Sequence, residues 1–130
     1  MKQYRDIALK IAIEAHKNQK DKAGHDFINH PITVSKIIYD QFYDSIENLA
    51  IINARPLEEI LDLLVSASYL HDVLEDTIYT SQTLRAKGIP LEIIKIVELL
   101  TREKDSGQTY FEYINKISKS QFATIIKLLI

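Results

Sequence analysis

The chain has no cysteine and no tryptophan, and it has only three glycines and three prolines among its 130 residues. Without cysteine there is no disulfide, no thiolate metal ligand and no thiol nucleophile. Any metal site must therefore be built from His, Asp and Glu, which are ligands for hard or borderline cations.

Long apolar runs and an excess of one charge are also absent. The chain has 16 lysines and arginines and 18 aspartates and glutamates, which gives a net charge of −2. This balance does not indicate nucleic acid or a membrane surface as a partner. No apolar run approaches the roughly 18 residues of a membrane helix, and the N-terminus lacks the apolar core of a signal peptide. We therefore expect a cytoplasmic protein that binds neither nucleic acid nor membrane.

The apolar residues, 46% of the chain, recur with a helical period almost throughout. Residues 44–54 are ambiguous, and no segment alternates cleanly enough to predict a strand. This pattern predicts an all-α, single-domain helical bundle over residues 1–130, and bundles of this kind often place a metal site between facing helices. The predicted helical segments are 2–18, 31–43, 56–76, 80–87, 90–101, 109–117 and 119–130.

Ionisable residues crowd the end of the longest predicted helix, in the segment His71-Asp72-Val73-Leu74-Glu75-Asp76-Thr77. His71 falls on the apolar stripe and should point inward. The three carboxylates add negative charge to a helix C-terminus that already carries a partial negative charge. A bound cation would compensate for that charge. The alternative is a solvated acidic helix end with a hydrogen-bonded core histidine, and the segment alone leaves both open.

His30 precedes Pro31 at a second break in the chain. Because proline disfavours helical geometry in the residue before it, we expect His30 in a loop, as a ligand directed at another helix. Lys20 and Lys22 lie upstream, where they could hold phosphate oxygens beside a metal. The alternative is a solvated loop with a His-Pro pair of no special role.

Together these segments resemble the HD superfamily of metal-dependent phosphohydrolases. The resemblance is closest to the (p)ppGpp hydrolase domains of the RelA/SpoT type and to small stand-alone HD proteins. The most specific part is the HD-x-x-ED-T pattern with F-I-N-H-P upstream. The matching stretches run nearly end to end and include Gln19 to Gly24, Phe27 to Pro31, Tyr69 to Thr77, and Leu100-Thr101-Arg102.

The resemblance implies an HD-type bundle that holds a divalent cation, manganese in many members. His30, His71 and Asp72 correspond to its metal ligands. Such a domain would be a phosphohydrolase acting on a nucleotide or another small phosphoester, with the 3′-pyrophosphate of (p)ppGpp as the candidate bond.

The resemblance also assigns residues around the metal. Glu75 and Asp76 correspond to the acidic pair that orients or deprotonates the attacking water. Lys20 and Lys22 correspond to basic residues that contact substrate. His16 matches a recurrent position near the site, and we interpret it as structural.

One position departs from the family pattern. The family supplies a further metal-binding aspartate from a late helix, in a K-L-A-D motif. This chain has Lys127-Leu128-Leu129-Ile130 there, so we expect an HD domain that is truncated or altered after Lys127-Leu128. Isoleucine cannot coordinate a metal. The alternative function is therefore a degenerate HD domain that binds nucleotide or a protein partner with little or no turnover. The apolar C-terminus also suggests a homodimer or a domain swap.

The departure predicts a weakened metal site, because a carboxylate ligand supplies both charge and a geometric anchor. Calorimetric titration of the chain with Mn²⁺ should give an affinity weaker than micromolar. A micromolar or tighter affinity would contradict the prediction.

Overall fold

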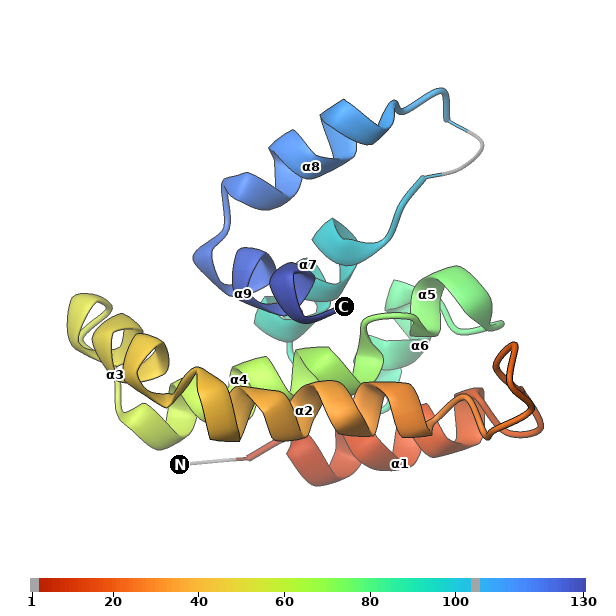
Figure 1. Cartoon of the computed structure of the whole chain (residues 1–130), viewed down its shortest axis with the longest axis horizontal. Helices are drawn as coiled ribbons and strands as arrows, with labels where there is room; N and C mark the ends of the chain where they lie inside the picture. The colour runs from red at the N-terminus through yellow and green to blue at the C-terminus, as the bar shows by residue number, and fades with distance from the viewer. Residues whose placement is uncertain (1–2, 104–105) are drawn as a thin grey trace.

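A computed structural model describes residues 3–103 and 106–130, and these form helices joined by short loops, without a strand (Figure 1). The predicted all-α class is confirmed. The helices are α1 (Arg5–Ala15), α2 (Asn29–Gln41), α3 (Tyr43–Ile52), α4 (Leu57–Leu70), α5 (Val73–Asp76), α6 (Ser81–Ala86), α7 (Leu91–Leu100), α8 (Tyr110–Ser118) and α9 (Gln121–Leu129).

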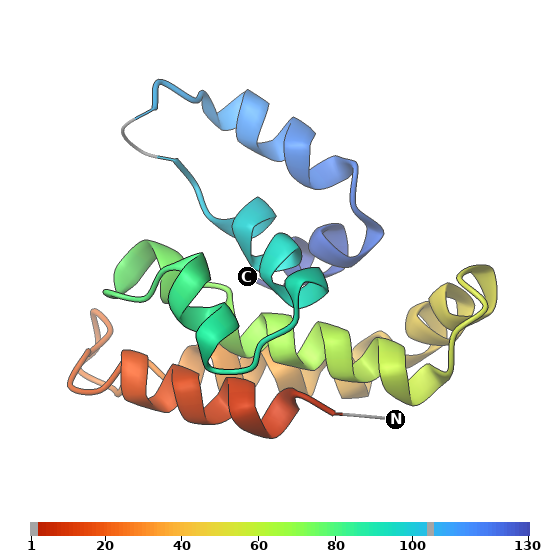
Figure 2. The same cartoon turned by 180° about the vertical axis from the view of Figure 1, so that it is seen from behind.

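Helix α4 is the centre of the bundle. Ten of its 14 residues are buried, as expected for a helix that is apolar on nearly every face. It packs against α1 and α2 on one side and against α7 and α9 on the other (Figure 1). Seen from behind, α1 runs along the C-terminal half of α4 (Figure 2). The C-terminal end of α4 is therefore enclosed by several helices.

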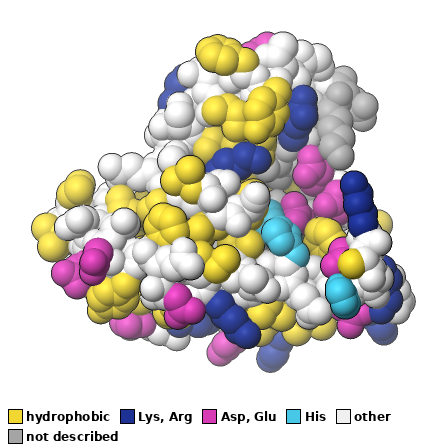
Figure 3. Space-filling model, viewed as in Figure 1, with side chains coloured by type: hydrophobic (Ala, Val, Ile, Leu, Met, Phe, Trp, Pro, Cys, Tyr) yellow, Lys and Arg dark blue, Asp and Glu magenta, His cyan; other side chains and the backbone are white. Residues whose placement is uncertain are grey.

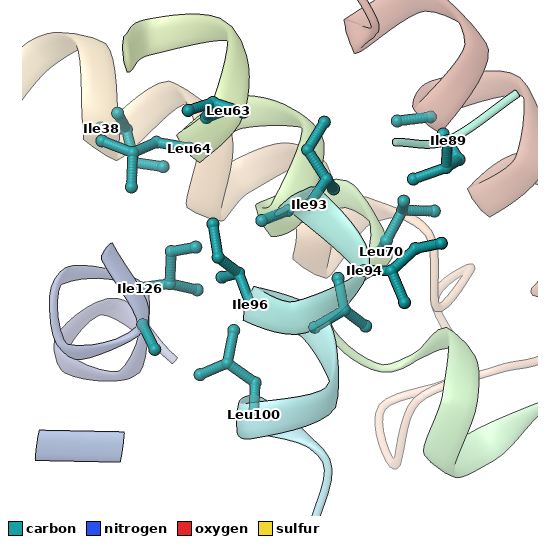
Figure 4. Packing of buried hydrophobic residues seen from close by; sticks show 14 of the residues in the cluster. Ile38, Leu63, Leu64, Leu70, Ile89, Ile93, Ile94, Ile96, Leu100 and Ile126 are labelled. Carbon is teal, nitrogen blue, oxygen red and sulfur yellow. The ribbon is translucent and has the colours of Figure 1, made fainter. Parts of the chain in front are cut away.

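Aliphatic side chains from four helices meet in the core. Ile38 of α2, Leu64 of α4, Ile93 of α7 and Ile126 of α9 are all fully buried (Figure 4). Burying one such side chain contributes about 1.5–3 kcal/mol. The core therefore fixes the relative positions of the helices whose ends carry the candidate site.

A buried carboxylate ties the start of α1 to the middle of α4. Asp62 is only 3% exposed and accepts the backbone N–H groups of Tyr4 at 2.9 Å and Arg5 at 3.1 Å. The Nε of Arg5 lies 3.2 Å from the same carboxylate. The first N–H groups of a helix have no partner inside it, so Asp62 serves as a cap supplied from another helix.

The prediction of a single helix over residues 56–76 is wrong at its C-terminal end. Helix α4 ends at Leu70 and α5 begins at Val73, with His71 and Asp72 in the turn between them. The ring of His71 binds the carbonyl of Ser68, which a continuing helix would pair with the N–H of Asp72. Asp72 has φ −102° and ψ −2°, and α4 and α5 are separate helices on either side of this turn.

The prediction that His30 lies in a loop is also wrong. Helix α2 begins at Asn29, so His30 and Pro31 lie in its first turn. Proline is tolerated there because the N–H it lacks would have no partner inside the helix. The N–H of His30 instead donates to the carbonyl of Phe27 at 3.0 Å, and this holds the histidine at the helix start.

The other segments follow the prediction closely. Residues 44–52 of the ambiguous segment 44–54 lie in α3, and the segment predicted over 2–18 is helical from Arg5 to Ala15. Residues 1–2 of that prediction lie outside the described part of the chain. None of the helices described is long and apolar enough to cross a bilayer.

Replacing Asp62 by alanine should lower the free energy of unfolding by about 3–5 kcal/mol, which is the usual cost of removing one partner of a buried ion pair. Denaturant unfolding measures this. The matched control is Glu47→Ala, an exposed acidic residue on α3, which should change stability by less than about 0.5 kcal/mol. Equal stabilities for the two variants would show that Asp62 does not anchor α1.

Candidate metal centre

Three of the predicted residues converge at one end of the bundle. One ligand atom from each of His30, His71 and Asp72 lies within 4.8 Å of the other two. His30 comes from the first turn of α2, and the other two from the turn between α4 and α5. His71 is 2% exposed, Asp72 is half-buried and His30 is exposed. The group therefore has a buried floor and an open side.

The proton on the His71 ring is located by its neighbours. Nδ1 lies 2.7 Å from the carbonyl oxygen of Ser68, and a carbonyl can only accept. Nδ1–H is therefore the donor, and in the neutral ring Nε2 carries a free lone pair. Metal-binding histidines are usually held in this way, with the second ring nitrogen donating to a carbonyl or carboxylate.

The free nitrogen of His71 faces a carboxylate at close range. Nε2 lies 2.9 Å from Oδ2 of Asp72. Two lone pairs at this distance repel unless a positive charge lies between or beside them, either a proton on His71 or a cation. Two adjacent ligands at about 2.1 Å from an octahedral ion are about 3.0 Å apart. The separation therefore suits two ligands of one ion.

The second imidazole completes the group. The rings of His30 and His71 are 5.2 Å apart between centroids and meet edge-on at 71°. Burial and the charge of His71 hold the pKa of His30 below its ordinary value, against the opposing effect of Asp72. A lowered pKa favours the neutral imidazole, the form that binds metal.

The carboxyl group of Asp72 stays ionised for a different reason. Burial acts to raise its pKa, but the hydrogen bond and charge of His71 and the charges of the other nearby histidines outweigh it. The pKa of Asp72 is therefore held below its usual value. A hard cation finds here one anionic oxygen beside two imidazoles, a donor set that suits a divalent metal.

A second acidic group adjoins the first. Carboxylate oxygens of Asp72, Glu75 and Asp76 also lie within 4.8 Å of one another, because α5 is a single turn. Figure 3 shows a histidine side chain in cyan beside a group of acidic side chains in magenta. Burial and the charges of Glu75 and Asp72 raise the pKa of Tyr113 in α8 to about 12.

The remaining predicted residues lie in the loop between α1 and α2. Lys20 forms an ion pair with Asp26 across this loop, and Lys22 is exposed in the same loop.

The aromatic residues of α8 differ in exposure. Tyr113 is buried, and its hydroxyl donates to the carbonyl of Leu100 at 2.7 Å. Phe111 is 79% exposed.

The sequence did not reveal the contact between this loop and α5. The side-chain amide of Gln19 donates to the carbonyl of Asp76 at 3.1 Å, and its oxygen lies 3.0 Å from Nδ1 of His16. The only available signal was a glutamine three residues after a histidine at a helix end. His16 is buried, as a structural role would require.

Ile130 stands at the position that corresponds to the aspartate of the family's K-L-A-D motif, and it is 38% exposed. Among the residues that the structure describes, Asp72 is the carboxylate grouped with both histidines.

No protein-family model matches the chain. Three curated proteins are similar to it. Over 99 residues it is 31% identical to the guanosine-3′,5′-bis(diphosphate) 3′-pyrophosphohydrolase MESH1 of Danio rerio, covering 74% of this chain and 46% of the relative. Over 126 residues it is 28% identical to the guanosine-3′,5′-bis(diphosphate) 3′-pyrophosphohydrolase of Haemophilus influenzae, covering 91% of the chain and 16% of the relative.

The third relative is the GTP pyrophosphokinase rsh of Brucella melitensis, 30% identical over 97 residues, which are 75% of this chain and 10% of that protein. The chain thus spans less than half the length of any of these three relatives. These similarities bear out the resemblance drawn from the sequence motifs.

The geometry predicts which histidines matter for cation binding. Replacing His71 by alanine should weaken Mn²⁺ or Co²⁺ binding by at least about 10-fold, since even loss of a residue that only supports a ligand costs about 10–100-fold. Calorimetry measures the affinity. The control is His25→Ala, which removes an exposed histidine of the loop. Similar affinities for the two variants would show that His71 does not bind the cation.

Proposed function

Because the chain belongs to the HD superfamily, in its RelA/SpoT branch, we propose that it is a metal-dependent phosphohydrolase acting on a nucleotide. The observation that carries the proposal is the group of two imidazoles and one carboxylate within 4.8 Å, with a second carboxylate group beside it. One group suits a divalent cation, Mn²⁺ in our proposal, and the other suits proton transfer from water.

The proposed substrate is guanosine 3′,5′-bis(diphosphate), with cleavage of its 3′-pyrophosphate. This is the activity named in the Haemophilus influenzae and Danio rerio relatives. We place it in the cytoplasm, with a soluble nucleotide rather than nucleic acid or a membrane as the partner. The homodimer or domain swap expected at the C-terminal helix stays a prediction, for which the 72% exposure of Leu128 offers a surface.

In this proposal His30, His71 and Asp72 would hold the metal. The metal, when bound, would lower the pKa of water and polarise a phosphoryl oxygen. The carbonyl of Ser68 keeps the ring of His71 oriented with Nε2 toward the site. The turn between α4 and α5 presents its histidine and aspartate to the same point.

The acidic pair of α5 would handle the proton. Glu75 and Asp76 lie within one turn of Asp72, so a carboxylate oxygen can accept a proton from the attacking water or align it with phosphorus. Lys20 and Lys22 would contact the phosphates. Lys20 would first have to exchange its partner Asp26 for a phosphate oxygen.

A second candidate function is binding of nucleotide or a protein partner with little or no turnover. The observation in its favour is Ile130, which stands where the family has an aspartate. Without that carboxylate the cation would be held by fewer anionic oxygens and would be more hydrated.

A nucleotide panel tests the proposal. The chain is incubated with guanosine 3′,5′-bis(diphosphate) and other nucleotides in the presence of Mn²⁺, Mg²⁺, Co²⁺ or Ni²⁺, and products are separated by chromatography. Pyrophosphate release from the 3′ position should require the added metal. Glu75→Gln and Asp76→Asn should each lower kcat by about 100- to 10,000-fold, the usual contribution of general acid–base catalysis.

The control for this assay is Glu47→Gln, an exposed residue of α3, which should match the parent chain. Turnover that survives both acidic substitutions unchanged would exclude the proposed role of α5. Nucleotide binding without hydrolysis under every metal would favour the second candidate function.

A further inference from the structure

Gln19 joins two parts of the candidate site that are far apart in the sequence. It lies in the loop after α1, at the same end of the bundle as α5 (Figures 1 and 2). Its side-chain amide donates to the carbonyl of Asp76 at 3.1 Å, and its own carbonyl accepts the N–H of Phe27 at 2.9 Å. The carbonyl of Phe27 in turn accepts the N–H of His30 at 3.0 Å. Hydrogen bonds through Gln19 therefore connect a candidate metal ligand with an acidic residue of α5.

The side-chain amide of Gln19 has a defined orientation. The carbonyl of Asp76 can only accept, so the NH₂ group of the amide faces it. The amide oxygen then faces His16, whose Nδ1 lies 3.0 Å away and donates to it. His16 is 2% exposed, and its carbonyl accepts the N–H of Gln19 at 3.0 Å. A buried residue at the end of α1 thus holds both the main chain and the side chain of Gln19.

Helix α5 needs support because it is a single turn that carries like charges. Carboxylate oxygens of Asp72, Glu75 and Asp76 lie within 4.8 Å of one another, and like charges at this separation repel. A single turn has little stability of its own, and the last carbonyls of a helix have no partner inside it. The bond from Gln19 gives one of these carbonyls a partner and ties the exposed Asp76 to the loop.

We propose that Gln19 is a positioning residue, which holds Asp76 at a fixed place relative to His30. The carboxylate of Asp76 can align a water molecule with phosphorus only if it keeps its distance from the metal group. The hydrogen bonds through Gln19 join the two main-chain segments that set this distance. This inference rests on the proposed function and adds to it a residue that acts through Asp76.

Two substitutions separate the two hydrogen bonds of the Gln19 amide. Gln19→Glu keeps an oxygen that can accept from His16 but removes the donor to Asp76. Gln19→Met keeps a side chain of similar length and removes both bonds. The matched control is Gln41→Glu, which changes an exposed glutamine at the opposite end of α2 from the metal group.

Gln19→Met and Gln19→Glu should each lower kcat by about 10–100-fold, the usual loss when a residue that supports a metal site is replaced. The affinity for Mn²⁺ should stay near that of the parent chain, because the three candidate ligands remain. Gln41→Glu should match the parent chain in both measurements. A parent-like kcat in both Gln19 variants, measured where they are folded, would overturn the proposal, and so would a loss of Mn²⁺ affinity as large as the loss of kcat.

A double-mutant cycle shows whether Gln19 acts through Asp76. Substitutions of residues that depend on each other are not additive. When Asp76 is already replaced by asparagine, Gln19→Met should have little further effect on kcat. An equal loss in the two backgrounds would mean that Gln19 affects the site by another route, and the proposal would be wrong.

Amide hydrogen exchange tests the positioning without turnover. The N–H of Asp76 donates to the carbonyl of Asp72 at 2.9 Å, and that of Thr77 to the carbonyl of Val73 at 3.2 Å, so both report on α5. In the Gln19→Met variant these two amides should exchange about 2–10-fold faster, the effect of losing one intramolecular hydrogen bond, while the amides of α4 keep their rates. Unchanged exchange in α5 would overturn the proposal. If the parent chain hydrolyses no nucleotide, the proposed function fails, and the exchange rates alone decide whether Gln19 holds α5.

Discussion

The candidate site depends on a nitrogen and an oxygen that face each other at 2.9 Å, Nε2 of His71 and Oδ2 of Asp72. Since Ser68 takes the other ring proton, this contact is favourable only with a positive charge at it. Two residues adjacent in sequence make the contact possible because the helix ends just before them. The interruption between α4 and α5 therefore gives this His-Asp pair a geometry that suits a cation.

The bundle supplies the rigidity that this contact needs. Helix α4 is buried on nearly every face, so its C-terminal end cannot shift without disturbing α1, α2 and α7. The start of α2 brings His30 to the same point, and the carboxylates of α5 follow within one turn. In this arrangement the imidazole of His71 lies on the buried side, whereas His30 and the acidic oxygens lie toward the more open side.

Much of this could be predicted from the sequence. Apolar periodicity identified nearly every helix, because each buries one face in a common core. The spacing of His71, Asp72, Glu75 and Asp76 indicated that ionisable side chains crowd the end of one helix. The helix break at His71 was missed, since the side-chain bond to Ser68 that accompanies it leaves no mark on the apolar pattern. The helical position of His30 was missed because the tendency of a residue before proline to avoid helical geometry is only a preference, and in the first turn of α2 Pro31 costs the helix no hydrogen bond.

Contacts that depend on how a loop folds could not be predicted from local patterns. The ion pair of Lys20 with Asp26 and the hydrogen bond from Gln19 to Asp76 both depend on how the loop after α1 folds back. Nothing in the residues around Gln19 identifies its acceptor, which is 57 positions away. The candidate ligand residues could be predicted from the sequence, whereas the hydrogen bonds around them required coordinates.

The Gln19–Asp76 bond also bears on how the protein reaches its native state. It joins the first quarter of the chain to a single-turn helix in the second half, and a turn as short as α5 has little stability of its own. Closure of the loop over α5 therefore helps to hold in place the turn that carries Glu75 and Asp76. A cation that prefers the closed arrangement would draw the folding equilibrium toward it, so occupancy of the centre and integrity of this end of the bundle would rise and fall together.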